Sequence, residues 1–266
     1  MTQNKVIETA IDASFKVWEG VYASFADAPA LGPGFDGLIW RDRSLQAARE
    51  ALALVGTDQP LDYSLRQRNA ILPVLTATVL NEQPRASILD FGGGLGTGFM
   101  VLSHAVPAAA AKVDYSVIEV DNICRAGTDL FAGKTGPSFR TDLPERSGFD
   151  IVQAASVMQY IEAWQSVVAR LAHYGARYML FSDMFVGGFQ SYVTLQNYYG
   201  SRIRHWFFND REFIADVERC GYELALRSFC DAKILGTYGP LAMENFAPEL
   251  RIPHASHLLF RRQGAE

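Results

Sequence analysis

The chain has 266 residues, of which 49% are hydrophobic, and a formal net charge of −5 at pH 7. This length and apolar fraction suffice to bury a large core with room for a small extra domain, so we do not expect extensive disorder. The net negative charge predicts no basic surface of the kind that binds nucleic acid. No apolar run reaches the roughly 18 residues that a membrane-spanning helix needs. Because the first residues lack the pattern of a signal peptide, we expect a cytoplasmic protein.

The N-terminal third of the chain has mainly helical patterns. Apolar residues recur at spacings of three and four between Ile7 and Tyr22, which predicts an amphipathic helix over residues 5–24. Three segments follow in chain order: a Gly- and Pro-rich loop over 28–40, a helix over 42–55, and a helix over 62–82 that Pro73 should kink or split. We therefore expect residues 1–85 to form a helical cap that precedes the main domain.

After residue 86 the patterns alternate between strand and helix. Such alternation favours a doubly wound, mostly parallel sheet with helices on both faces. The expected strands are 87–91, 113–120, 138–141, 149–155 and 177–182, followed after a helix over 210–221 by a closing pair at 222–229 and 256–261. The sequence thus predicts an α/β domain over residues 86–266.

Residues 87–98, Ser-Ile-Leu-Asp-Phe-Gly-Gly-Gly-Leu-Gly-Thr-Gly, form the most informative stretch. Its first apolar residues, Ile88 and Leu89, fit a buried parallel strand that must end at Gly92. The glycines that follow allow positive φ values and let a ligand approach main-chain N–H groups that a Cβ would shield. A helix can begin near Phe99 with its free N–H groups facing the same ligand. The stretch therefore predicts a ligand cradle between a strand and a helix.

The spacing of these glycines separates two ligand classes. The dinucleotide pattern G-x-G-x-x-G fails in both strict registers, because its third place falls on Thr97 or Phe99. The pattern D-x-G-x-G-x-G fits at Asp90, Gly92, Gly94 and Gly96. A carboxylate at this strand end would repel a pyrophosphate but tolerate a cationic ligand. The stretch resembles the first motif of class I methyltransferases, whose methyl donor S-adenosylmethionine carries an ammonium and a sulfonium group.

That resemblance implies a Rossmann-like fold with a seven-stranded sheet, which matches the strands counted above, and it implies further donor-binding residues. Glu119 ends the second strand, 23 residues after the last motif glycine, where a carboxylate can accept from both ribose hydroxyls; Asp121 is the alternative. The family often has an acid against the adenine amino group, here Asp142, although a turn-forming aspartate before Pro144 fits as well. Ser156 follows the fourth strand and can reach the donor or the acceptor.

Several shorter stretches narrow the resemblance. Residues 19–28, 90–96, 117–119, 156–160 and 220–222 together resemble a small bacterial family of methyltransferases. Members of that family are often encoded near surface-polysaccharide assembly genes. The resemblance implies O-methylation of a sugar or of another small hydroxyl-bearing acceptor, in polysaccharide or secondary metabolism.

Methyl transfer to a hydroxyl also needs a base, and the segment 183–210 offers candidates. We expect this segment to be an acceptor-side insertion after the fifth strand. His205 has a suitable unperturbed pKa near 6.5, so we rank it ahead of Asp183 at the strand end, while Asp210 is better explained as a helix cap. The aromatic residues of the segment could wall an acceptor pocket or belong to the core.

Three hypotheses for the function remain open. The first is an S-adenosylmethionine-dependent O-methyltransferase, the second a nicotinamide-dependent oxidoreductase or sugar-nucleotide epimerase, and the third a non-catalytic partner subunit that keeps the nucleoside pocket. We expect a small-molecule or glycan acceptor and no nucleic-acid partner, and the sequence predicts no oligomeric state. Cys124, Cys220 and Cys230 show no C-x-x-C spacing, so we expect reduced thiols and no metal site.

Overall fold

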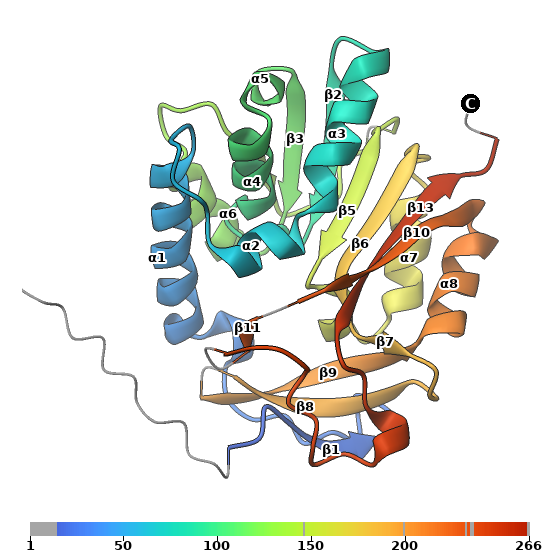
Figure 1. Cartoon of the computed structure of the whole chain (residues 1–266). Helices are drawn as coiled ribbons and strands as arrows, with labels where there is room; N and C mark the ends of the chain where they lie inside the picture. Colours follow the sequence, from blue (N-terminus) through green and yellow to red (C-terminus); the bar gives the residue numbers. More distant parts are fainter. Residues whose placement is uncertain (1–14, 146, 199, 232, 235–236, 265–266) are drawn as a thin grey trace, which may run out of the picture.

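The computed structural model describes residues 15–264 except 146, 199, 232, 235 and 236, and its centre is a seven-stranded sheet in the order β10-β13-β6-β5-β2-β3-β4 (Figure 1). The strands are β2 Ala86–Phe91, β3 Val113–Ile118, β4 Ser138–Arg140, β5 Ile151–Ala155, β6 Tyr178–Met184, β10 Tyr222–Cys230 and β13 Ala255–Arg262. Strands β2 to β6 pair in parallel, whereas β13 pairs antiparallel with β6 and β10. The predicted α/β, Rossmann-like sheet of seven strands is confirmed.

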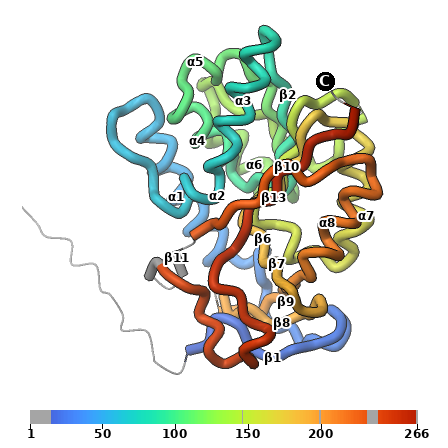
Figure 2. The backbone as a smooth tube through the Cα atoms, turned by 45° about the vertical axis from the view of Figure 1, so that its right-hand side comes forward, coloured from blue at the N-terminus to red at the C-terminus, as the bar shows by residue number. Residues whose placement is uncertain are grey.

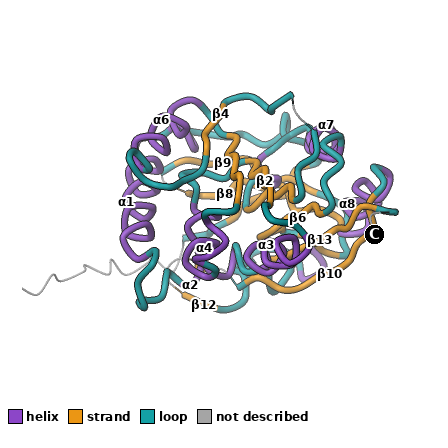
Figure 3. Tube along the Cα trace, turned by 90° about the horizontal axis from the view of Figure 1, so that it is seen from above, coloured by secondary structure: helices purple, strands orange, loops and turns teal. Residues whose placement is uncertain are grey.

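Helices cover both faces of this sheet, as the view from above in Figure 3 shows. They are α1 Leu38–Leu54, α2 Tyr63–Arg68, α3 Ile71–Glu82, α4 Thr97–Ala105, α5 Pro107–Ala110, α6 Asp121–Leu130, α7 Trp164–Ala172 and α8 Asp210–Arg219, with short 3₁₀ helices η1 Gly34–Asp36, η2 Met158–Tyr160 and η3 Pro248–Leu250. Successive side chains of a strand point to opposite faces, so Ile88 packs with α1 and α3 to α6, whereas Leu89 packs with α7 and α8. No helix among the described residues is long and apolar enough to cross a membrane.

A second sheet of four strands lies across the carboxyl ends of the main parallel strands (Figures 1 and 2). Its order is β1-β8-β9-β7, and its strands are β1 Trp18–Tyr22, β7 Val186–Gly187, β8 Tyr192–Tyr198 and β9 Ser201–Asn209. Three of them therefore fall in the segment 183–210 that we expected as an insertion. A separate short pair, β11 Lys233–Ile234 and β12 Thr237–Tyr238, follows β10. The ligand-binding edge expected of a parallel sheet is thus covered by a second layer of strands.

The helix predicted over residues 5–24 is wrong where the structure describes it. Residues 1–14 lie outside the described residues, and Trp18–Tyr22 form β1, which pairs antiparallel with β8. The aromatic spacing that suggested a helix face instead buries Trp18 against Phe185 and Phe207. Gly20, with φ of 78°, accompanies a shift in the register of that pairing. Pairing with a strand far along the chain has overridden the local periodicity.

The next N-terminal elements agree better with the sequence. The helix predicted over 42–55 is α1, although it begins earlier, at Leu38. The helix predicted over 62–82 is divided into α2 and α3, and Pro73 lies in the first turn of α3, where a missing N–H breaks no helical hydrogen bond. Of these N-terminal elements, α1 and α3 pack into the core of the main sheet, whereas β1 joins the second sheet. A separate cap over residues 1–85 stays a prediction.

Candidate functional site

The turn between β2 and α4 leaves backbone open to a ligand. Gly92, Gly94 and Gly96 have φ values of 68°, 56° and 78°, which residues with a Cβ rarely adopt. A Cβ on Gly92 would collide with the side chain of Val157, whereas a Cβ on Gly94 would meet nothing within 4 Å. Packing therefore requires a glycine at position 92, while the turn leaves space at Gly94 that a ligand can use.

Asp90, the acid of the motif, lies against the backbone of this turn and is fully buried. The Tyr115 hydroxyl donates to its Oδ2 at 2.6 Å, and Gln153 Nε2 donates to its Oδ1 at 3.3 Å. Burial raises the pKa of Asp90 to about 7, against the opposing effect of these two hydrogen bonds. A Cβ on Gly93 or Gly98 would run into this carboxyl or its tyrosine partner. The sequence suggested that Asp90 meets a cationic ligand; in the structure it supports the turn from within the protein.

Glu119 joins the second strand to the glycine turn. Its Oε1 accepts from the N–H of Gly94 at 3.1 Å, and its Oε2 accepts from the N–H of Val120 at 3.0 Å. Burial raises the pKa of Glu119, and the two backbone N–H groups oppose that rise. The side chain is half-buried. The structure therefore brings a carboxylate with remaining acceptor capacity to the open part of the turn.

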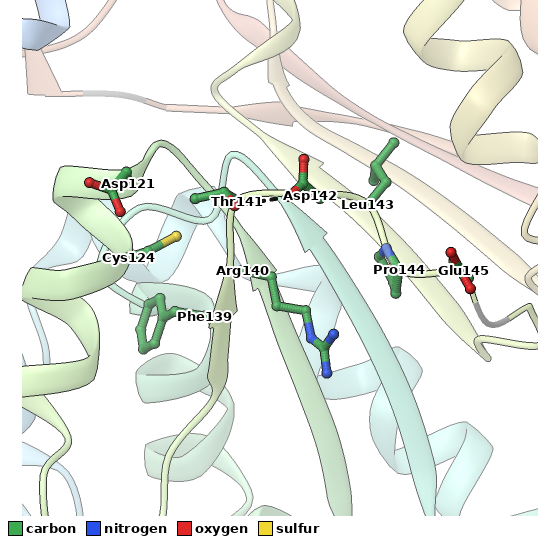
Figure 4. A pocket seen from close by; sticks show the side chains of 9 residues that line it. All are labelled: Asp121, Cys124, Phe139, Arg140, Thr141, Asp142, Leu143, Pro144 and Glu145. Atoms are coloured by element: carbon green, nitrogen blue, oxygen red, sulfur yellow. Dashed lines mark hydrogen bonds between the residues drawn. The ribbon is translucent and has the colours of Figure 1, made fainter.

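A cavity of about 560 Å³ lies between α6 and the loop after β4 (Figure 4). Its walls come from α6, from β4 and from the loop that follows β4: Asp121, Cys124, Phe139, Arg140, Thr141, Asp142, Leu143, Pro144 and Glu145. The cavity adjoins Glu119, because Cys124 Sγ donates to the Glu119 carbonyl at 3.2 Å. Asp142 is exposed and accepts from Thr141 Oγ1 at 3.1 Å. Both acids that the sequence suggested near the nucleoside, Asp121 and Asp142, thus line one cavity.

The ends of β5 and β6 carry backbone strain. Ser156 and Asp183 have φ values of 58° and 56°, and among the described residues no other non-glycine residue has a positive φ. The two positions lie on neighbouring strands, where the Ser156 N–H donates to the carbonyl of Ser182 at 2.9 Å. Side chains held in this region cost free energy and cluster at functional sites. This strain marks the edge of the main sheet that faces β8 and β9 as a candidate functional site.

Asp183 forms an ion pair that the sequence did not suggest. Arg68 Nε, at the end of α2, lies 3.3 Å from Asp183 Oδ2. The other oxygen, Oδ1, is buried and has no hydrogen-bond partner among the described residues. Tyr160, Tyr198, Cys230 and His257 surround the pair. No local pattern marks Arg68, because it meets Asp183 across 115 positions of sequence.

His205 lies in the middle of β9 and is enclosed by aromatic rings. The ring centroids of Phe185, Phe207, Tyr160 and Trp18 lie 4.7, 5.1, 5.4 and 5.9 Å from that of the imidazole. Burial lowers the pKa of His205 to about 3, and neither ring nitrogen has a hydrogen-bond partner among the described residues. The imidazole is therefore neutral at pH 7. Tyr160 is a neighbour both of this imidazole and of the Arg68–Asp183 pair.

The structure brings the sequence-derived residues together in two groups. The first group, which contains residues expected from the sequence to bind the donor and is called the donor-side group, consists of Asp90, Gly92, Gly94, Gly96 and Glu119 with the cavity that Asp142 lines. The second group contains both base candidates, and we call it the acceptor-side group for that reason. It consists of Ser156, Asp183 and His205, together with Arg68 and Tyr160, which the sequence did not single out. Within the described part of the chain, no three His, Cys, Asp or Glu side chains gather as metal ligands would.

Comparison with known proteins relates this chain to others by fold. No protein-family model matches the sequence, and no curated protein matches it. An S-adenosylmethionine-dependent methyltransferase from Clostridium acetobutylicum superposes with a TM-score of 0.50 at 11% identity, over 84% of this chain and 100% of that one. Two other solved structures are a 1,6-didemethyltoxoflavin-N1-methyltransferase from Burkholderia thailandensis (TM-score 0.48, 14% identity, 91% and 99% covered) and a magnesium protoporphyrin IX methyltransferase from Synechocystis (0.46, 14%, 85% and 99%). The chain has the Rossmann-like fold of the Clostridium methyltransferase.

Proposed function

We propose that this protein is an enzyme that transfers a methyl group from S-adenosylmethionine to a small acceptor. The observation that carries the proposal is the contact between Glu119 and the N–H of Gly94. This contact places a carboxylate that can accept from two ribose hydroxyls beside Gly94, a position with no side chain. The fold shared with the Clostridium enzyme supports the proposal at the level of architecture.

The residues around the turn fit this donor. The open space beside Gly94 suits the close approach of a ligand to the backbone. Glu119 would hold the ribose, and the cavity lined by Asp142 and Leu143 would take the adenine. When bound, S-adenosylmethionine supplies a methyl group activated by its sulfonium. The chain's own task is to hold donor and acceptor in line and to exclude water.

We propose a hydroxyl as the acceptor group and Asp183 as its base. The buried, unpartnered Oδ1 of Asp183 is available to accept a hydrogen bond from a ligand hydroxyl. His205, the other candidate from the sequence, is enclosed by rings and has a pKa of about 3, so it is a weak base. A sugar acceptor rests on the sequence resemblance alone and is one member of this class.

Titration calorimetry with S-adenosylhomocysteine tests the donor site. Glu119→Ala should weaken binding by about 1–3 kcal/mol, because ribose hydroxyls lose their acceptor. Asp121→Ala removes the rival acid. Asp129→Ala is the matched control, because Asp129 lies on the same helix and is likewise exposed but does not line the cavity; both variants should leave the affinity within about threefold. Unchanged binding by Glu119→Ala would remove this residue from the site.

The alternative functions give different results in the same experiments. A nicotinamide-dependent oxidoreductase or epimerase would bind NADH, with a change in its fluorescence, and not S-adenosylhomocysteine. A non-catalytic partner subunit would bind S-adenosylhomocysteine but transfer no labelled methyl group to any member of a panel of hydroxyl acceptors. Binding together with transfer is the result that the proposal requires.

A further inference from the structure

The acceptor side of the site contains a cation whose charge is not isolated from the solvent. The Arg68 side chain is 39% exposed, while the Asp183 side chain beside it is only 5% exposed. The contact between them uses Nε of Arg68. A guanidinium carries five N–H donors in a planar fork, so Arg68 has the capacity to bind a second anionic oxygen while it holds Asp183.

The carboxylate of Asp183 lacks one partner that a ligand could provide. Its Oδ1 is buried without a hydrogen bond to any described residue, which costs free energy unless a donor arrives. The backbone at Asp183 is held at a φ of 56° by its place in β6. An O–H group that donates to Oδ1 would satisfy this oxygen, next to a carboxylate whose other oxygen already pairs with Arg68.

The groups that face the ion pair come from four further elements, η2, β8, β10 and β13, and they are Tyr160, Tyr198, Cys230 and His257. Burial raises the pKa of Tyr160, and the Asp183 charge adds to that rise. Burial likewise raises the pKa of the Cys230 thiol to about 12 and lowers that of His257. At neutral pH these three side chains carry no charge, so Arg68 and Asp183 supply opposite charges to otherwise uncharged neighbours.

This charge arrangement favours proton transfer from an acidic O–H group. When a proton moves to Asp183, its carboxyl becomes neutral and the Arg68 charge becomes available to the oxygen that has just become negative. The gap between ordinary pKa values is about 6 units for transfer from a phenol to a carboxylate, but about 12 units from a water-like O–H. A single neighbouring cation can offset much more of the pKa difference for the phenol than of the larger difference for the water-like O–H.

Aromatic side chains border the same place. The Tyr160 hydroxyl donates a hydrogen bond to Gln196 Oε1 at 2.8 Å. The Tyr160 ring packs edge-on against the Phe35 ring, with 4.6 Å between their centroids. Phe35 in turn packs against Trp40, 5.4 Å away, and Tyr198 is 40% exposed. Such faces and edges suit a flat ring in the acceptor.

We propose that the acceptor is an aromatic hydroxyl, a phenol, that donates its O–H to Asp183 and is held as the oxyanion by Arg68. The acceptor oxygen gives its proton to Asp183 Oδ1, and its new bond to the donor methyl carbon forms as the carbon–sulfur bond breaks. The electron pair of the broken bond stays on sulfur, which leaves as the neutral thioether. This inference rests on the proposed function and narrows its acceptor to one chemical class, in place of a sugar.

The test uses two probes that share a ring. 4-Nitrophenol absorbs visible light as its anion, whereas 4-nitrobenzyl alcohol has an O–H that stays protonated. Both are titrated into the protein saturated with S-adenosylhomocysteine, at a pH one unit below the pKa of free 4-nitrophenol. We expect 4-nitrophenol to bind as the visible, ionised form and at least about tenfold more tightly than the alcohol, as a charge-assisted hydrogen bond predicts. Binding of 4-nitrophenol in its protonated form, equal binding of both probes, or no binding of 4-nitrophenol would overturn the inference.

Variants locate the effect at Arg68. Arg68→Gln should abolish the visible absorbance of the bound probe, while Arg66→Gln, two residues earlier on the same helix and exposed, should preserve it. Because Arg68→Gln leaves Asp183 unpaired and can unfold the protein, the double variant Arg68→Gln with Asp183→Asn, which removes both charges, must also lose the absorbance. Retained absorbance in a folded variant without Arg68 would refute its role. A protein that does not bind S-adenosylhomocysteine at all would instead refute the proposed function.

Discussion

The proposed donor side and the proposed acceptor side of this site are built in different ways. On the donor side, one continuous strand, turn and helix present backbone N–H groups, and the next strand adds Glu119. On the acceptor side, α2, η2, β6, β9 and β13 each contribute side chains from distant parts of the sequence. The proposed nucleoside site thus depends on a local backbone shape, whereas the proposed acceptor site depends on the packing of two sheets against each other.

The two sides also bury their titratable groups with opposite consequences. Asp90 beneath the glycine turn has a raised pKa, because burial favours its neutral, protonated form. His205 among the aromatic rings has a lowered pKa, because burial favours its neutral, deprotonated form. Both groups therefore make the stability of the fold depend on pH, in opposite directions.

The largest effect should come from Asp183→Asn, which tests the acceptor side alone. Loss of a general base should lower turnover by about 10²–10⁴-fold, whereas affinity for S-adenosylhomocysteine should stay within about threefold, since Asp183 lies outside the donor-side group. Transfer of a labelled methyl group and titration calorimetry measure the two quantities. Near-normal turnover by Asp183→Asn, with a large loss in His205→Phe, would move the base to His205.

The glycine turn between β2 and α4 could be predicted from sequence because its information is local. The residues at 92, 94 and 96 each adopt a positive φ, and glycine is the residue type that adopts such values readily, so the residue type itself indicates the turn. The strand and helix periods around them likewise predicted the succession of strands and helices along the chain that forms the main sheet. The same local reasoning failed for Trp18–Tyr22, because that segment takes its structure from pairing with β8.

The acceptor side could be predicted only in part, because its contacts are long-range. Asp183 was found from its place at a strand end, but nothing near Arg68 in sequence indicates that it meets Asp183. His205 was favoured for its ordinary pKa, whereas the aromatic enclosure that lowers this pKa arises from β1, η2, β9 and the residue after β6 together. Reading such a site requires the packed structure.

His205→Phe should reveal the pH dependence of the acceptor side. Since the folded pKa is about 3 and the unfolded one about 6.5, the unfolded chain binds more protons between these values. The wild-type free energy of unfolding should therefore fall as pH falls through this window, by up to about 5 kcal/mol. Urea titrations across the window should show a shallower fall in the variant. An unchanged slope would mean that the imidazole titrates normally in the folded protein.

Asp90→Asn should change the slope in the opposite direction. The folded pKa is about 7 and the unfolded one about 4, so here the folded protein binds more protons within that window. Asp90 then lowers the free energy of unfolding as pH rises from about 4 to about 7, by up to about 4 kcal/mol. In the variant this loss should disappear. If both variants shift the slope in the same direction, the contrast between the two sides is wrong.

Gly92→Ala and Gly94→Ala should have the smallest effects and separate packing from ligand space within one turn. Both positions have φ in the left-handed region, where an alanine costs about 1–2 kcal/mol of stability. At Gly92 the new Cβ also collides with Val157, whereas at Gly94 it enters open space. Urea unfolding should therefore show a greater loss for Gly92→Ala, while Gly94→Ala should lose more affinity for S-adenosylhomocysteine than its small loss of stability explains. Full affinity in Gly94→Ala would mean that the donor does not lie against this turn.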